Sequence, residues 1–180
     1  MQRKTLIDWV KVVVLALVAV YMIQTFLFAN YVVHGQSMMP TIHDGNRVIV
    51  SKINYDFGKP KRFQLIVFHY SKSEDFIKRV IGLPGDSLHY KNDVLYVNGK
   101  AMKEPYLKPF KERLGSGLLT HNFTLKEKTG RMKVPKGCVF VLGDNRRNSY
   151  DSRYFGFVPM SKIVGKVDVR YWPLNTFQVY

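Results

Sequence analysis

The hydrophobic pattern divides the chain into one long apolar run followed by many short ones. Residues 12–29 carry no charged side chain, and their only clear polar interruptions are Gln24 and Thr25. A run of this length lies at the short end of what a membrane-spanning helix requires. We therefore expect a transmembrane signal-anchor helix over these residues.

Basic residues fix the expected orientation of this helix. Arg3, Lys4 and Lys11 precede it, so the positive-inside rule places residues 1–11 in the cytoplasm and residues 30–180 outside the cell membrane. A cleaved signal peptide is the alternative interpretation. The apolar run is long for such a peptide, and a cleavage site after residue 29 would have the large Leu27 where a small residue is required. An uncleaved, single-pass anchor is the prediction.

Past the anchor, short stretches rich in Val, Ile and aromatic residues predict β-strands. These stretches lie at 31–33, 47–50, 63–70, 75–82, 139–142, 163–164 and 167–171. Asn98-Gly99 between two further short strands predicts a hairpin with a type I′ turn. Residues 103–135 are rich in Lys, Gly, Pro and Thr with weak periodicity, and we interpret them as an insertion. No clear helix is expected beyond the anchor, so the fold class is mainly β, an antiparallel domain behind one transmembrane helix.

The formal net charge is +15. Such an excess suits nucleic acid, anionic lipid or an anionic wall polymer, or serves only solubility. The expected export of the domain argues against nucleic acid as a partner. The single cysteine, Cys138, cannot form an internal disulfide, and no Cys/His cluster has metal-binding spacing. We expect no metal and no cofactor.

The segment GQSMMPTI, residues 35–42, places Ser37 just past the anchor. A nucleophilic serine needs a base, and none of the five histidines sits in a triad signature. A lysine can serve only if burial lowers its pKa. Lys78 in FIKRVIG would share an apolar strand face with Phe76, but Arg79 would have equally apolar company on the other face. The pattern cannot choose between the two, and taken alone each of these residues reads as ordinary surface or loop.

A third segment, GDNRRNSYDSR, covers residues 143–153 and is dense in turn-forming residues. Asp151 and Arg153 are close enough in sequence for a local ion pair. The spacing does not fit a calcium-binding loop. By itself the segment predicts an ordered loop.

The segments GQSMMPT, FIKRVIGLPGD and GDNRRNSYDSR occur in this order behind a single anchor. Together they resemble the bacterial type I signal peptidases of the short Gram-positive type. The similarity runs from the anchor to about Trp172-Pro173. The resemblance implies a largely β catalytic core with a β insertion at about 91–137.

The resemblance also implies roles for individual residues. Ser37 would be the nucleophile of a Ser-Lys dyad, with its backbone N–H in the oxyanion hole, and Lys78 the general base. Ser149 would orient the lysine, and Asp151 with Arg153 would hold the last segment against the site. By analogy, the substrate pocket would be lined by Val33, Gly35, Met38, Ile42, Phe76 and Ile77.

The chain departs from the family pattern in two of its segments. Gly35 replaces a serine whose hydroxyl helps the oxyanion hole in some members, which puts the second oxyanion donor in doubt. Arg62-Phe63-Gln64 replaces Arg-Gly-Asp, and we expect an effect on packing only.

The implied substrates are exported preproteins whose signal peptides are still in the lipid bilayer. Cleavage would follow small residues at positions −1 and −3, and residues 31–36 would pair with the extended substrate as an added strand. Ser37 stands eight residues past Ala29, a tether that suits a bond emerging at the membrane surface. We expect a monomer.

Two other functions share features with this sequence. The self-cleaving repressor proteases share a Ser-Lys dyad but need a DNA-binding domain and a cytoplasmic location, which the anchor opposes. A non-catalytic, membrane-anchored basic binding module is the alternative from another class, and it predicts that Ser37 and Lys78 are dispensable.

Overall fold

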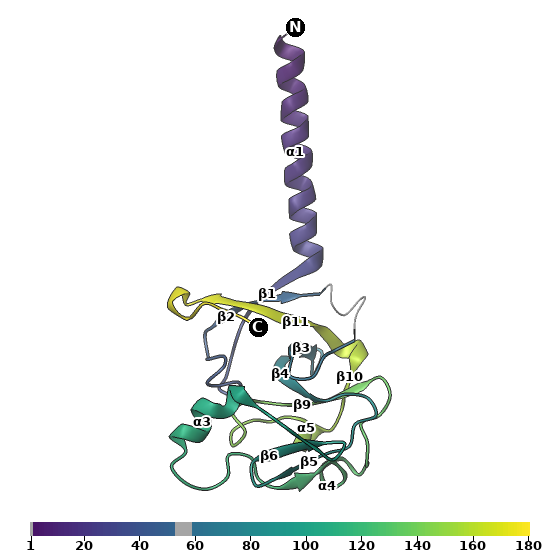
Figure 1. Ribbon diagram of the computed structural model, residues 1–180. Coiled ribbons are helices and arrows are strands. Elements are labelled where there is room, and N and C mark those ends of the chain that lie inside the picture. The colour runs from purple at the N-terminus through teal and green to yellow at the C-terminus, as the bar shows by residue number, and fades with distance from the viewer. Residues whose placement is uncertain (1, 53–58) are drawn as a thin grey trace.

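The computed structural model describes residues 2–52 and 59–180. Its first element is helix α1, Gln2–Leu27, which stands clear of the rest of the chain (Figure 1). Ile7–Leu27 is long and apolar enough to cross a membrane, and its most apolar window is not buried against protein. An apolar helix without protein around it is stable in lipid, because its backbone hydrogen bonds are satisfied internally.

The bounds of α1 differ from the anchor expected at 12–29. The helix begins at Gln2, because the basic residues before the apolar run are themselves good helix formers. It ends at Leu27, because the next residues already belong to strand β1, Phe28–Val32. β1 pairs in antiparallel fashion with β2, Arg47–Ser51, so sheet hydrogen bonds replace helical ones from residue 28 onward.

The larger sheet has eight strands, and all its pairings are antiparallel. Its order is β1-β2-β11-β3-β4-β9-β10, with β12 paired to β11. The remaining strands are β3 Leu65–His69, β4 Asp75–Gly82, β9 Cys138–Leu142, β10 Val158–Pro159, β11 Ile163–Trp172 and β12 Gln178–Val179. The strands predicted at 163–164 and 167–171 form the single strand β11, because register shifts let its pairing continue between them.

The smaller sheet lies at the end of the domain away from α1 (Figure 1). Its order is β7-β6-β5-β8. The strands are β5 Leu88–Lys91, β6 Val94–Val97, β7 Lys100–Met102 and β8 Phe123–Thr124. Asn98 and Gly99 have φ of 50° and 78°, and the left-handed conformation at both positions confirms the predicted type I′ turn.

The expectation of no helix beyond the anchor is wrong. The structure contains α3 Lys108–Arg113, α4 Leu125–Thr129 and α5 Ser152–Phe155. Each is too short for a helical periodicity to show. A local signal was nevertheless present for α4, since Thr124 and Glu127 form a capping box and Gly130 ends the helix with φ of 71°.

Three buried apolar clusters hold the domain together. One joins the smaller sheet to β9 through Phe140 and Leu142. Another lies under the segment that carries Ser37 and includes Met38 and Ile42, which are 2% and 0% exposed. These two side chains fix the segment that follows β1 onto the larger sheet.

Candidate active site

Ser37 and Lys78 meet directly. Lys78 Nζ donates to Ser37 Oγ at 2.7 Å. Ser37 lies in the loop between β1 and β2, which is closed at its base by the Val33 N–H donating to the Asn46 carbonyl at 2.8 Å. Lys78 lies in the middle of β4 and is 4% exposed, whereas Ser37 is half-buried and so open to a substrate. A hydroxyl at this distance from an amine can pass its proton to that amine.

Burial changes the acidity of Lys78. Desolvation lowers its pKa from 10.5 to about 8, although Asp151 and Asp144 partly oppose the shift. The side chain packs against Phe76, with Nζ 5.0 Å from the ring centroid. A pKa near 8 leaves about a tenth of the lysine neutral at pH 7, whereas an exposed lysine would be almost wholly protonated. Lys78 can therefore act as a base near neutral pH.

Arg79, the other candidate from the strand pattern, lies on the opposite face of β4. Its Nε and Nη2 donate to both carboxylate oxygens of Asp144 at 2.8 and 2.6 Å. Its Nη1 donates to the Phe63 carbonyl at 2.7 Å. The guanidinium is thus committed to a buried, bidentate ion pair, which leaves Lys78 as the residue on the active-site side.

Ser149 lies close to the loop that carries Ser37. It is 9% exposed, and its Oγ has no hydrogen-bond partner among the described residues. Gly143 makes this packing possible, because a Cβ there would lie 2.2 Å from Ser149 Oγ and 2.5 Å from the Ser37 carbonyl oxygen. The Asn145 N–H donates to the same Ser37 carbonyl at 3.0 Å. The loop that carries Ser149 therefore also holds Ser37 in position.

Asp151 and Arg153 form the ion pair that their spacing suggested, with Arg153 Nη2 2.8 Å from Asp151 Oδ2. Asp151 is fully buried and caps α5 by accepting from the Arg153 N–H. It also accepts from the Gly143 N–H at 3.0 Å. These bonds tie both ends of the loop at 143–151 together.

The sequence reasoning missed the buried residue Arg146. Its side chain is fully buried and pairs with Glu104 at 2.6 Å. It also donates to Tyr90 Oη at 2.6 Å and to the Gly143 carbonyl at 3.1 Å. Glu104 belongs to the insertion and Tyr90 to β5 of the smaller sheet, so both of these regions support the loop that carries Ser149. Nothing in the local pattern of either segment indicated this contact.

A pocket of about 230 Å³ opens beside the dyad. Its lining comes from the end of β1, the loop that carries Ser37, strands β3 and β4, and the loop before α5. The residues are Tyr31, Val32, Val33, His34, Gly35, Ser37, Met38, Val67, Asp75, Phe76, Ile77, Lys78 and Tyr150.

Of the six pocket residues expected by analogy, Ile42 needs correction. It does not line this pocket but is wholly buried in the core cluster that contains Met38. The Ile42 N–H donates to the Met38 carbonyl, as in one turn of a helix. Residues four apart in such a turn lie on the same face, so the Ile42 side chain points into the core beside Met38. Tyr31, Asp75 and Tyr150 line the pocket and were not expected.

Gly35 has a conformational reason to be glycine. Its φ is 89°, a left-handed value that a serine would adopt only with strain. Its N–H donates to Asp44 Oδ1 at 2.7 Å and is therefore already engaged. In residues 2–52 and 59–180 no cluster of three or more His, Cys, Asp or Glu could hold a metal ion.

Comparisons with known proteins all point to one family. Residues 6–172 match the family model described as signal peptidase, peptidase S26. A signal peptidase I from Bacillus caldolyticus is 59% identical over 162 residues, covering 90% of this chain and 89% of that protein. A signal peptidase IB from Staphylococcus aureus strain Mu50 is 41% identical over 180 residues, covering 98% and 94%.

Among solved structures, a crystal structure of a signal peptidase I from Enterococcus faecalis V583 matches with a TM-score of 0.57 and 44% identity. It covers 60% of this chain and 96% of that one. The sequence match, residues 6–172, includes all three segments, and the structural match covers 60% of the chain. The chain therefore belongs to the signal peptidases of the peptidase S26 family, which are serine endopeptidases.

Proposed function

We propose that this chain releases signal peptides from exported preproteins with Ser37 and Lys78 as a catalytic dyad. The observation that carries the proposal is the 2.7 Å contact between Lys78 Nζ and Ser37 Oγ, combined with the lowered pKa of the lysine. Neutral Lys78 accepts the proton of Ser37, and Oγ attacks the scissile carbonyl to form a tetrahedral oxyanion near the Ser37 N–H. Protonated Lys78 then gives its proton to the leaving amine, and the acyl-enzyme remains.

Deacylation reverses these roles with water as the nucleophile. Lys78 takes a proton from the water, and the ester to Ser37 breaks as Oγ regains a proton. Ser149 Oγ, buried and without a partner among the described residues, is available to orient the lysine amine. Asp151 and Arg153 act through the loop that carries it.

Free strand edges support the proposed mode of substrate binding. β1 is the edge strand of its sheet, and the ladder between β4 and β9 begins only at Arg79. The first half of β4, Asp75 to Lys78, and the end of β1 both line the pocket. An extended peptide can therefore pair with backbone on either side of the pocket while its alternate side chains, at −1 and −3, point into it.

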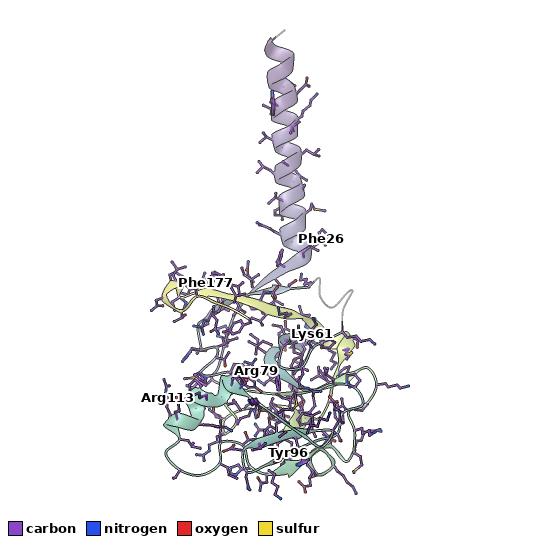
Figure 2. The ribbon with its side chains drawn as sticks, viewed as in Figure 1. Phe26, Lys61, Arg79, Tyr96, Arg113 and Phe177 are labelled. Carbon is purple, nitrogen blue, oxygen red and sulfur yellow. The ribbon has the colours of Figure 1, made fainter. Side chains whose placement is uncertain are left out.

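Exposed apolar side chains support a location at the bilayer surface. Trp172, Leu174, Phe177 and Val179 are between 49% and 71% exposed. They lie in the C-terminal segment, at the end of the domain from which α1 projects (Figure 1), and Figure 2 shows Phe177 at this end. The basic residues before the apolar run support a cytoplasmic N-terminus. The substrate then reaches the dyad just outside the membrane, and a monomer suffices.

The test uses the full-length protein in detergent with its Ser37→Ala and Lys78→Ala variants. Each is mixed with a precursor peptide that has Ala at −3 and −1, and the products are identified by mass spectrometry. Cleavage after the −1 Ala by the wild type alone is the expected result. Cleavage by either folded variant would refute the dyad, and no cleavage by folded wild type would favour a non-catalytic binding module.

A further inference from the structure

Tyr31 and Asp75 both line the substrate pocket and form a hydrogen bond with each other. Tyr31 Oη donates to Asp75 Oδ2 at 2.9 Å, and the other carboxylate oxygen lies 2.6 Å from His69 Nδ1. Tyr31 belongs to β1 and Asp75 to β4. Three strands separate β1 from β4 in the sheet order. The bond therefore links two pocket walls that no ladder joins.

The position of this pair along the pocket follows from the strand geometry. Asp75 precedes Lys78 by three residues on β4, which is about 10 Å along an extended strand. In an extended substrate the −1 and −3 side chains point the same way and are about 7 Å apart. With the −1 carbonyl at Ser37, the −3 side chain points toward the end of the pocket that Tyr31 and Asp75 close.

The chemistry of the pair suits a fixed wall. Burial and the bond to Asp75 raise the pKa of Tyr31 to about 12, so the phenol remains a donor at neutral pH. Both oxygens of Asp75 are engaged, one by Tyr31 and one by His69. The pocket of about 230 Å³ is smaller than the roughly 300–1,000 Å³ that is usual for small-molecule sites.

We propose that Tyr31 and Asp75 are specificity-determining residues, a latch that restricts position −3 of the substrate to small apolar side chains. This role rests on the function proposed above, and it names the residues that determine the substrate preference at position −3. The Tyr31 ring bounds the space, and Asp75 holds the ring in place. The same bond keeps the carboxylate from accepting a hydrogen bond from the substrate.

The experiment measures kcat/KM for peptides that carry Ala at −1 and Ala, Leu or Lys at −3. Tyr31→Ala and Asp75→Ala should raise the Leu-to-Ala ratio at −3 about tenfold or more, because the pocket opens. Tyr31→Phe should keep the size limit but raise the Lys-to-Ala ratio, because one Asp75 oxygen becomes free. Tyr96→Phe, on β6 of the smaller sheet, is the matched control and should change neither ratio.

A second set of peptides varies position −1 with Ala kept at −3. Each ratio is internal to one variant, so a partly unfolded preparation cannot produce a change at −3 alone. The same peptides are also titrated onto Ser37→Ala forms of every variant, so the −3 preference is read from binding without turnover. Unchanged −3 ratios in both alanine variants would overturn the latch. Absence of cleavage by wild type, with the −3 preference intact in binding, would instead overturn the proposed catalysis.

Discussion

Arg79 and Asp144 form a buried, bidentate ion pair one residue along β4 from Lys78. Asp144 is fully buried and also accepts a hydrogen bond from the hydroxyl of Thr41, which lies in the same loop as Ser37. The pair therefore joins the strand that carries Lys78 to the loop that carries Ser37. Neither residue lines the pocket beside Lys78, and we expect the pair to set the distance between Lys78 and Ser37.

Removing one partner of this pair should be costly. Asp144→Ala leaves Arg79 buried without its counter-charge, and we expect a loss of about 3–5 kcal/mol in the free energy of unfolding. Denaturant unfolding of the detergent-solubilised chain measures this. Glu112→Ala is the control, since its partner Lys108 is exposed and the loss should stay below about 1 kcal/mol. Equal stability of the two variants would contradict the structural role of Asp144.

The lowered pKa of Lys78 predicts how activity depends on pH. Only the neutral amine can accept the Ser37 proton, so kcat/KM should rise as pH increases through about 8 and then level off. Lys78→Arg should be inactive, because a guanidinium stays protonated. A pH series from 6 to 10 with the Ala/Ala peptide tests both statements. A flat profile would contradict the general-base role.

The same pKa predicts that Lys78 destabilises the folded protein. Lys78 titrates near 8 in the folded protein and near 10.5 when unfolded, so the unfolded chain binds more protons between these values. The burial penalty is fully present below pH 8, and stability recovers as pH rises toward 10.5. Lys78→Met should therefore gain up to about 3 kcal/mol at pH 7, with the gain shrinking at higher pH.

Lys72→Met is the control for that measurement, because Lys72 is exposed in the turn before β4. Its unfolding free energy should match the wild type at every pH. A Lys78→Met protein that is less stable than the wild type at pH 7 would show that lost packing exceeds the relief of the buried charge.

The sequence could predict the strands, because alternating Val and Ile mark half-buried surfaces, and the hairpin, because Asn98-Gly99 dictates its own turn. It could not decide between Lys78 and Arg79, since both faces of β4 are apolar and only their partners differ. The family resemblance indicated Ser37 and Lys78 as the dyad, whereas the contacts around these two residues could not be predicted from the sequence. Arg146 pairs with Glu104 across 42 residues of sequence, and neither segment carries a local sign of burial.

That long-range ion pair makes a prediction about the insertion. Arg146→Met leaves the Glu104 carboxylate buried and unpaired, which should cost about 3–5 kcal/mol in unfolding free energy, whereas Arg146→Met with Glu104→Met should recover part of it. A double-mutant cycle by denaturant unfolding measures the coupling. Arg147→Met is the control, because Arg147 is exposed and, among the residues that the structure describes, its side chain donates only to the Leu118 carbonyl. If the two substitutions were additive, Arg146 and Glu104 would not be coupled, and the insertion would not stabilise the loop that carries Ser149.

Phe63 occupies a backbone conformation that normally favours glycine. Its φ is 69°, and it stands where the resemblance places the glycine of Arg-Gly-Asp. The ring packs 5.7 Å from that of Tyr106, and the Phe63 carbonyl accepts from Arg79. The phenylalanine thus combines useful packing with backbone strain of about 1–2 kcal/mol.

Two truncations of Phe63 separate the packing from the strain. Phe63→Ala and Phe63→Gly lose the same ring contacts, but only glycine removes the left-handed strain. Glycine increases the conformational entropy of the unfolded chain, which opposes its stabilising effect. We nevertheless expect the free energy of unfolding of Phe63→Gly to be about 1 kcal/mol higher than that of Phe63→Ala. At Gln64, where φ is not positive, the order should reverse, and Gln64→Ala should be the more stable of its pair. If alanine were the more stable substitution at both positions, the left-handed conformation of Phe63 would carry no cost, and packing against Tyr106 would alone account for the residue at this site.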